Sequence, residues 1–176
     1  MKNLFTLIKE DISMFRNKDT LGVKDYFMIL NPRMYPIVLF RISSFFQEMH
    51  LGIIAKIIST INFVLFGCDI ARGATIQGGL YLPHPSGVVI GEYAIIGHNC
   101  IIHQGVTLGD RGEEHETSNP TLGDYVEIGT GAKILGKILI NDYTRIGANS
   151  VVLKDTPKYS VVVGIPAVVI KYREVM

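Results

Sequence analysis

Cysteine is scarce in this sequence, since only Cys68 and Cys100 occur among 176 residues. So few cysteines argue against a disulfide scaffold and indicate a reducing compartment. An excess of one charge is also missing, because 17 Lys and Arg residues stand against 16 Asp and Glu residues, for a net charge of +1. That balance supplies no basic surface for phosphates, so we expect no nucleic-acid partner.

Long apolar runs are absent as well. The longest candidate, residues 51–66, is interrupted by Lys56 and by several polar residues. It therefore falls short of the roughly 18 uninterrupted apolar residues that would indicate a membrane-spanning helix. Residues 1–15 reach acidic side chains after a few apolar ones and have no small-residue cleavage site, so they do not predict a signal peptide. These features predict a cytoplasmic protein.

Glycine, by contrast, is abundant, with 18 residues, and it divides the chain into two patterns. Up to about residue 66, apolar residues recur at three- and four-residue spacing, which is typical of helices. Beyond about residue 70 that spacing disappears, and an aliphatic residue returns at every sixth position on either side of one interruption. The members of this series are Ile90, Ile96, Ile102, Leu108, Leu122, Ile128, Ile134, Ile140, Ile146 and Val152.

A six-residue period predicts a unit of one short strand and one turn, three of which complete a triangular coil. The aliphatic residue points inward, and Gly or Asn accepts the strained turn conformation. Ile70 and Ile76 start the series, and a slip of two residues interrupts it between Leu82 and Ile90. The sequence thus predicts a helical segment at 1–66 and a mainly β domain of about five coils at 67–176, with a polar loop inserted at 110–121.

This period is that of the hexapeptide-repeat, left-handed parallel β-helix proteins, which the sequence resembles from about Asp69 to Ile165. The stretch LPHPSGVVIGEYAIIGHNCIIHQGVTLGD resembles a segment of the serine O-acetyltransferases. TLGDYVEIGTGAKILGKI and TRIGANSVVLKD resemble the coils that follow, and NPRMYPIVLFRISSFF resembles the helical region that precedes them. The resemblance implies an acetyl-CoA-dependent O-acetyltransferase that transfers the acetyl group directly, with no metal.

The same resemblance implies that His84 is the general base that removes the proton from the acceptor hydroxyl. An imidazole can take that proton during attack, whereas an un-ionised alcohol attacks a thioester poorly at neutral pH. Asp69 lies fifteen residues earlier, almost one coil back, so we expect it beside His84, where a carboxylate fixes the imidazole tautomer. The alternative is that Asp69 caps the transition from helix to coil and that His84 only fills a loop.

The other histidines carry weaker expectations. We expect His98 and His103 to be structural or to line a wall, while His115 lies in the inserted loop, in reach of a neighbouring site. Together with His84, the first two suggest a three-histidine metal site like that of β-helix carbonic anhydrases. The spacing from His84 to His98 is less than one coil and offers no facing pair, so we expect no metal.

Departures from the serine O-acetyltransferase pattern bear on the acceptor. That family has an aspartate before the catalytic histidine and an Arg-His-Pro triplet at the loop end, where this chain has Pro83 and residues 118–120, Ser-Asn-Pro. An amino-acid substrate needs charged partners on leaving water. The loop GDRGEEHETSNPTLGD more closely resembles colanic-acid and capsule-type acetyltransferases, so we expect a sugar acceptor in surface polysaccharide biosynthesis, with L-serine as the alternative. The candidate acceptor contacts are Asn119, His115 and Asp19.

The family binds acetyl-CoA in a groove between adjacent β-helices, which implies a homotrimer. Backbone amides of glycine-rich turns face the pantetheine arm in such a groove, and basic residues meet the phosphates. The candidates for the arm are Gly109, Ala132 and Ala148, and those for the phosphates are Lys133, Arg145 and Lys154. The alternative from another class of protein is a non-catalytic trimer that scaffolds other enzymes.

The apolar helices at 37–66 have two possible positions. They either cap the open end of the β-helix, whose core an uncapped end would expose to water, or lie in a membrane interface. Arg41, Lys56 and Arg72 are too few and too scattered for a strongly basic membrane face. We therefore expect a cap, with at most weak peripheral membrane contact.

Overall fold

The computed structural model describes residues 3–112 and 118–174, so part of the expected loop at 110–121, including His115, lies outside the described residues. The helical elements are α1 (Leu4–Arg16), the 3₁₀ helix η1 (Val23–Leu30), α2 (Tyr35–Glu48) and α3 (Gly52–Phe66). The strands are β1 (Asp69–Ile70), β2 (Thr75–Ile76), β3 (Val89–Ile90), β4 (Ile95–Ile96), β5 (Ile101–Ile102), β6 (Thr107–Gly109), β7 (Thr121–Leu122), β8 (Glu127–Ile128), β9 (Lys133–Leu135), β10 (Leu139–Ile140), β11 (Arg145–Ile146), β12 (Val151–Val152), β13 (Ser160–Gly164) and β14 (Ala167–Tyr172).

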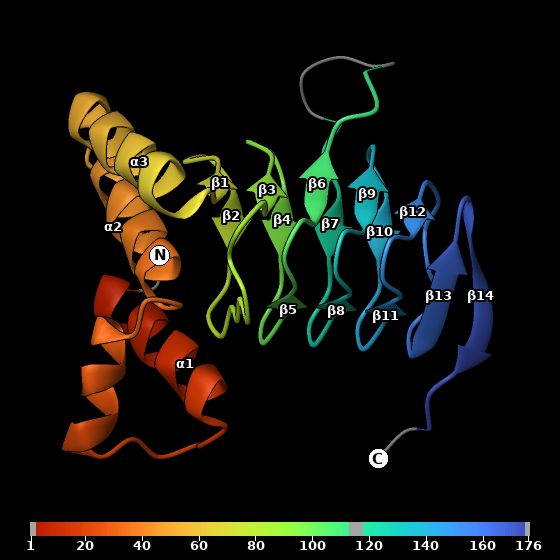
Figure 1. Ribbon diagram of the computed structural model, residues 1–176, viewed down its shortest axis with the longest axis horizontal. Helices are drawn as coiled ribbons and strands as arrows, with labels where there is room; N and C mark the ends of the chain where they lie inside the picture. The colour runs from red at the N-terminus through yellow and green to blue at the C-terminus, as the bar shows by residue number, and fades with distance from the viewer. Residues whose placement is uncertain (1–2, 113–117, 175–176) are drawn as a thin grey trace.

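Three sheets surround one core (Figure 1). Sheet A has the order β1-β3-β6-β9-β12, sheet B the order β2-β4-β7-β10, and sheet C the order β5-β8-β11-β13-β14. Neighbouring strands within the described residues run parallel, apart from the antiparallel β13–β14 pair. Because strands that follow one another along the chain enter successive sheets, each coil stacks on the one before it. The domain is a three-sided parallel β-helix.

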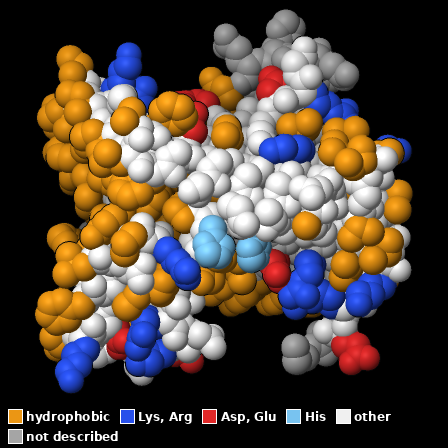
Figure 2. Space-filling view, in the orientation of Figure 1, with side chains coloured by type: hydrophobic (Ala, Val, Ile, Leu, Met, Phe, Trp, Pro, Cys, Tyr) orange, Lys and Arg blue, Asp and Glu red, His pale blue; other side chains and the backbone are white. Residues whose placement is uncertain are grey.

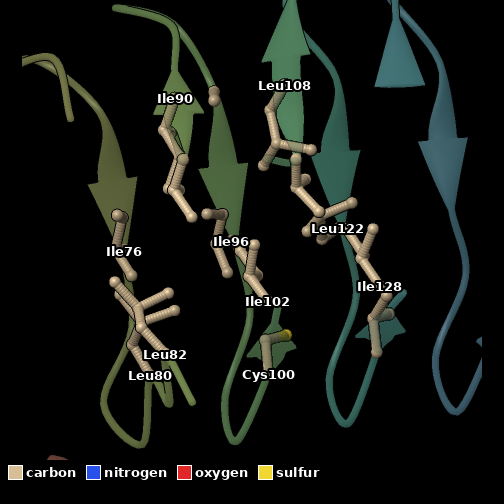
Figure 3. Packing of buried hydrophobic residues seen from close by; sticks show 14 of the residues in the cluster. Ile76, Leu80, Leu82, Ile90, Ile96, Cys100, Ile102, Leu108, Leu122 and Ile128 are labelled. Atoms are coloured by element: carbon tan, nitrogen blue, oxygen red, sulfur yellow. The ribbon is translucent and has the colours of Figure 1, made fainter. Parts of the chain in front are cut away.

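The inward aliphatic residues form the core of this β-helix, as the six-residue period predicts. All ten members of the series from Ile90 to Val152 are at most 2% exposed. Figure 3 shows several of them side by side between the strands, with Cys100 among them. Burying one such side chain contributes about 1.5–3 kcal/mol, so the repeated position is a main source of stability.

Glycines line the corner at which the chain passes from sheet C to sheet A, called here the C–A corner. Gly87, Gly105 and Gly131 have φ values of 72°, 68° and 72°, in the left-handed region that side chains with a Cβ rarely adopt. They also stack closely, since a Cβ on Gly87 would lie 3.4 Å from the Cα of Gly105, and one on Gly105 would lie 3.5 Å from the Cα of Gly131. The corner is therefore a narrow strip of bare backbone.

The first coil has no preceding coil with which to form hydrogen bonds. Farther along, each B–C corner donates to the coil before it, as the amide of Asn99 does to the carbonyl of Gly78 at 3.1 Å. The strand register makes Gly79 the counterpart of Asn99 on the first coil. Its amide donates instead to Oδ1 of Asp11 at 2.9 Å, and so does the amide of Leu80, also at 2.9 Å.

Arg41 supplies the matching donors for the first coil. Its Nη1 donates to the carbonyl of Ile76 at 2.6 Å and its Nη2 to that of Gln77 at 2.7 Å. Its Nε and Nη2 also donate to the Asp11 carboxylate, at 2.9 Å and 3.0 Å. Asp11 and Arg41 are 0% and 3% exposed. This buried ion pair makes the hydrogen bonds to the first coil that a preceding coil would otherwise make. Because α2 turns Arg41 toward the β-helix, this residue adds no charge to an outer basic face.

The helices lie across the N-terminal end of the β-helix, with apolar side chains left on their outer side (Figure 2). In α3, Ile53 is 80% exposed and Val64 is 70% exposed. None of the helices within the described residues is long and apolar enough to cross a membrane. The position of the helices fits the expected cap.

Candidate functional site

His84 occupies an insertion in the C–A corner. The amide of Ile102 donates to the carbonyl of Tyr81, and the amide of Gly105 donates to that of Ser86, at 3.0 Å and 3.1 Å. Tyr81 and Ser86 are five residues apart in the sequence, whereas their hydrogen-bond partners Ile102 and Gly105 on the next coil are only three residues apart. The first of these corners thus holds two extra residues, which explains the slip in the six-residue period. The insertion leaves the His84 side chain exposed.

Asp69 lies one coil before His84, at the start of β1. The amide of Gly87 donates to the carbonyl of Gly67 at 2.7 Å, which stacks the corner after His84 on the corner before Asp69. Both the Asp69 and the His84 side chains are exposed, and within the described residues no hydrogen bond or ion pair joins them. Gly67, in the left-handed conformation, ends α3, so Asp69 is not the residue that caps this helix.

Lys133 lies on the outer face of sheet A, in the row that begins at Asp69 and continues through Val89 and Thr107. Its Nζ donates to the carbonyl of Gly105 at 2.7 Å and to Oγ1 of Thr107 at 3.0 Å. The ammonium is therefore turned back toward the C–A corner, one coil from that of His84. The expected role of Lys133 at the coenzyme A phosphates stays a prediction, and in this structure its side chain lies along the β-helix and does not extend away from it.

The candidates for the pantetheine arm are placed differently from one another. Ala132 is fully buried, and its amide and carbonyl both take part in backbone hydrogen bonds, to Gly129 and from Thr107. Its buried side chain does not line a groove, and a contact between Ala132 and the arm stays a prediction. Ala148 is exposed beside the C–A corner, and Gly109 lies half-buried at the end of β6.

The remaining phosphate candidates do not converge within one chain. Arg145 lies on sheet C, where its Nε donates to Oε2 of Glu127 at 2.8 Å. Lys154 is exposed just after β12 of sheet A. A phosphate site that uses both residues therefore requires a neighbouring chain.

The acceptor candidates lie away from His84. Asn119 covers Gly91 beyond the end of β3, at the corner between sheets A and B, where a Cβ on Gly91 would clash with the side-chain oxygen Oδ1 of Asn119. Asp19 is exposed on the segment after α1, and His115 lies outside the described residues. Within one chain the structure does not bring Asn119 or Asp19 to the C–A corner. Both ends of the inserted loop leave from the A–B corner, which accounts for the position of Asn119.

The remaining candidate groups are His98, possible metal ligands and the two cysteines. The backbone amide of His98 donates to Oδ1 of Asp124 at 2.6 Å. The described residues contain no group of three or more His, Cys, Asp or Glu side chains that could hold a metal ion. Burial raises the pKa of the Cys68 thiol and of the Cys100 thiol to about 12, so both stay protonated and neither is a nucleophile at neutral pH.

Comparison with known proteins gives the following relatives. Residues 119–154 match the family described as bacterial transferase hexapeptide (six repeats). The chain is 39% identical over 168 residues to a serine acetyltransferase of Bacillus subtilis, which covers 94% of this chain and 77% of that protein. It is 42% identical over 143 residues to a serine acetyltransferase of Synechococcus elongatus, which covers 81% of this chain. The chain spans only 59% of the length of that second relative.

Solved structures of similar fold carry the same description. Soybean serine acetyltransferase complexed with serine superposes with a TM-score of 0.86 at 33% identity, over 95% of this chain and 69% of that one. Serine acetyltransferase of Brucella abortus in complex with coenzyme A superposes with a TM-score of 0.89 at 30% identity, over 98% of this chain and 69% of that one.

These findings correct the expected acceptor. The reading of the loop at 110–121 as colanic-acid or capsule-like, and with it the sugar acceptor and a role in polysaccharide biosynthesis, is wrong, because the relatives across most of the chain are serine acetyltransferases. The identity extends over the helical region as well as the β-helix. The chain belongs to the serine acetyltransferase family of hexapeptide-repeat transferases.

Proposed function

We propose that this protein transfers the acetyl group of acetyl-CoA to the hydroxyl of L-serine. The observation that carries the proposal is the 39% identity to the Bacillus subtilis enzyme across 94% of this chain. The relatives solved with serine and with coenzyme A support the choice of both substrates. The cytoplasm remains the predicted location, on the basis of two free, buried cysteines.

In the proposed reaction His84 acts on the acceptor. Its neutral imidazole takes the proton of the serine hydroxyl while the hydroxyl oxygen attacks the thioester carbonyl carbon. The tetrahedral intermediate then collapses, the carbon–sulfur bond breaks, and the imidazolium returns the proton to the leaving thiolate. Acetylserine and coenzyme A are the products, and no covalent enzyme intermediate forms.

Asp69 is proposed to orient this imidazole. A carboxylate that accepts from one ring nitrogen fixes the tautomer and stabilises the imidazolium that forms during attack. The two side chains lie on adjacent coils of one corner and are both exposed. Their placement on adjacent coils of one corner supports this role.

We also propose that the β-helix is left-handed and that three copies form a trimer whose grooves hold acetyl-CoA. The separation of Arg145 on sheet C from Lys154 after β12 of sheet A supports a groove built from two chains. Sheet B also exposes Ile95, at 46%, and Leu139, at 39%. Sedimentation is expected to give three times the mass of the chain, and a fully active monomer would contradict the trimer.

The direct test of the function is thiol release from acetyl-CoA in the presence of different acceptors. L-Serine is expected to support turnover with a KM in the usual range of about 1 µM–1 mM. L-Alanine, which lacks the hydroxyl, is the matched control and is expected to add nothing to the background hydrolysis. Turnover with a hydroxyl compound of another class and none with L-serine would overturn the proposal.

A further inference from the structure

An acceptor that is an amino acid brings a carboxylate to the corner beside His84. A carboxylate that leaves water needs a cation or several hydrogen-bond donors. The loop end at residues 118–120, Ser-Asn-Pro, offers no charge. The carboxylate therefore needs a Lys or Arg side chain that faces the C–A corner and has no carboxylate partner within the protein.

Most described cations near the β-helix are already engaged elsewhere. Arg41 and Arg145 are paired with acidic side chains, and Lys158 is paired with Asp142 at 2.6 Å. Arg72 donates to the helical segment, at the carbonyl of Gly52 and at Gln47. Arg111 donates to the carbonyl of Leu153, beyond the end of β12. None of these groups points to the C–A corner.

Lys133 differs from these cations. Its ammonium is held by two neutral oxygens, the carbonyl of Gly105 and Oγ1 of Thr107, and none of the ion pairs among the described residues includes it. An ammonium has three donors, so one remains after these two contacts. A fixed, half-buried cation with a free donor and no counter-ion is a site for an anion.

The position of this ammonium suits the acceptor. It lies at the level of Gly105, whose amide donates to the carbonyl of Ser86 in the corner that carries His84. Adjacent coils are roughly 4.8 Å apart, so the ammonium lies at the level of the coil next to that of His84. Asp69 lies one coil from His84 in the opposite direction.

We propose that the Lys133 ammonium binds the carboxylate of the acceptor amino acid while His84 holds its hydroxyl. This inference rests on the proposed function, since it assigns a residue to the recognition of its substrate. A Cβ on Gly87 would contact only the backbone of Gly105, and one on Gly105 only that of Gly131, so the corner presents backbone at both glycines. Lys133 therefore selects amino acids over neutral alcohols.

The test compares Lys133→Gln with the wild type on two acceptors, L-serine and L-serinamide, in which a neutral amide replaces the carboxylate. Glutamine keeps a donor for Gly105 but has no charge. The KM for L-serine is expected to rise about 10–100-fold, the worth of a hydrogen bond to a charged group. The KM for acetyl-CoA and the activity with L-serinamide are expected to stay within about two-fold of the wild type.

Lys137→Gln is the matched control, since Lys137 is exposed beyond β9, and it is expected to change neither constant. Lys133→Met, which keeps the aliphatic stem, replaces the glutamine variant if the latter fails to fold. An unchanged KM for L-serine would overturn the inference. So would a fall in kcat at constant KM, because the ammonium would then act on the oxyanion of the transition state. A wild type that neither acetylates L-serine nor binds it in calorimetry would instead refute the proposed function, and the inference with it.

Discussion

Replacing His84 by alanine is expected to lower kcat by about 10²–10⁴-fold, the usual contribution of a positioned general base. The variant is expected to fold like the wild type, because His84 lies in a two-residue insertion whose side chain is exposed and outside the stacked backbone hydrogen bonds of the corner. Initial rates with saturating acetyl-CoA and acceptor measure the effect.

The matched control is His98→Ala, at the B–C corner, where the contact to Asp124 uses the backbone amide and survives the change. Its kcat is expected to equal that of the wild type. Asp69→Asn is expected to lower kcat while leaving the affinity for acetyl-CoA nearly unchanged, because the carboxylate acts through the imidazole. Wild-type turnover in His84→Ala would remove this residue from the mechanism.

Asp11→Ala is expected to have the largest effect on stability, a loss of about 3–5 kcal/mol in the free energy of unfolding. The change leaves the Arg41 guanidinium buried without its carboxylate and removes the acceptor for the amides of Gly79 and Leu80. Urea unfolding at one fixed protein concentration measures the loss, because assembly makes the midpoint depend on concentration.

An exposed ion pair provides the comparison for that experiment. Lys158 and Asp142 form a contact of 2.6 Å with side chains that are 59% and 30% exposed. Lys158→Met is expected to cost less than about 1 kcal/mol, as surface pairs usually do. Equal losses for Asp11→Ala and Lys158→Met would show that the buried pair does not hold the helices to the first coil.

The parts of the fold that repeat could be predicted from the sequence, and the contact between the helices and the β-helix could not. Each inward aliphatic residue, such as Ile96 or Ile128, is identified by its neighbours six positions away. Asp11 and Arg41 are 30 residues apart and belong to no repeat, so no local pattern pairs them. The available signal was an arginine within the apolar stripe of α2, a position that a charge occupies only when it is paired.

The candidate site shows a similar division. The expectation for His84 comes from the resemblance of its segment to the serine O-acetyltransferases, and the structure adds that His84 lies where two extra residues break the six-residue period. The inward turn of Lys133 depends on the distance between its ammonium and the carbonyl of Gly105, which the spacing of residues does not reveal. The sequence does not show at which corner Asn119 lies, because the loop before it interrupts the six-residue period.

The ion pair at the first coil also bears on how such a molecule stays separate from its copies. A stack of identical coils presents, at its open end, the same row of donors and acceptors that the next coil would use, and such an edge is a template for fibre growth. Here the carbonyls of Ile76 and Gln77 and the amides of Gly79 and Leu80 are all taken by two side chains. Asp11 and Arg41 therefore occupy the backbone groups to which the end of another β-helix could bind. Occupying them prevents end-to-end association of copies at this corner.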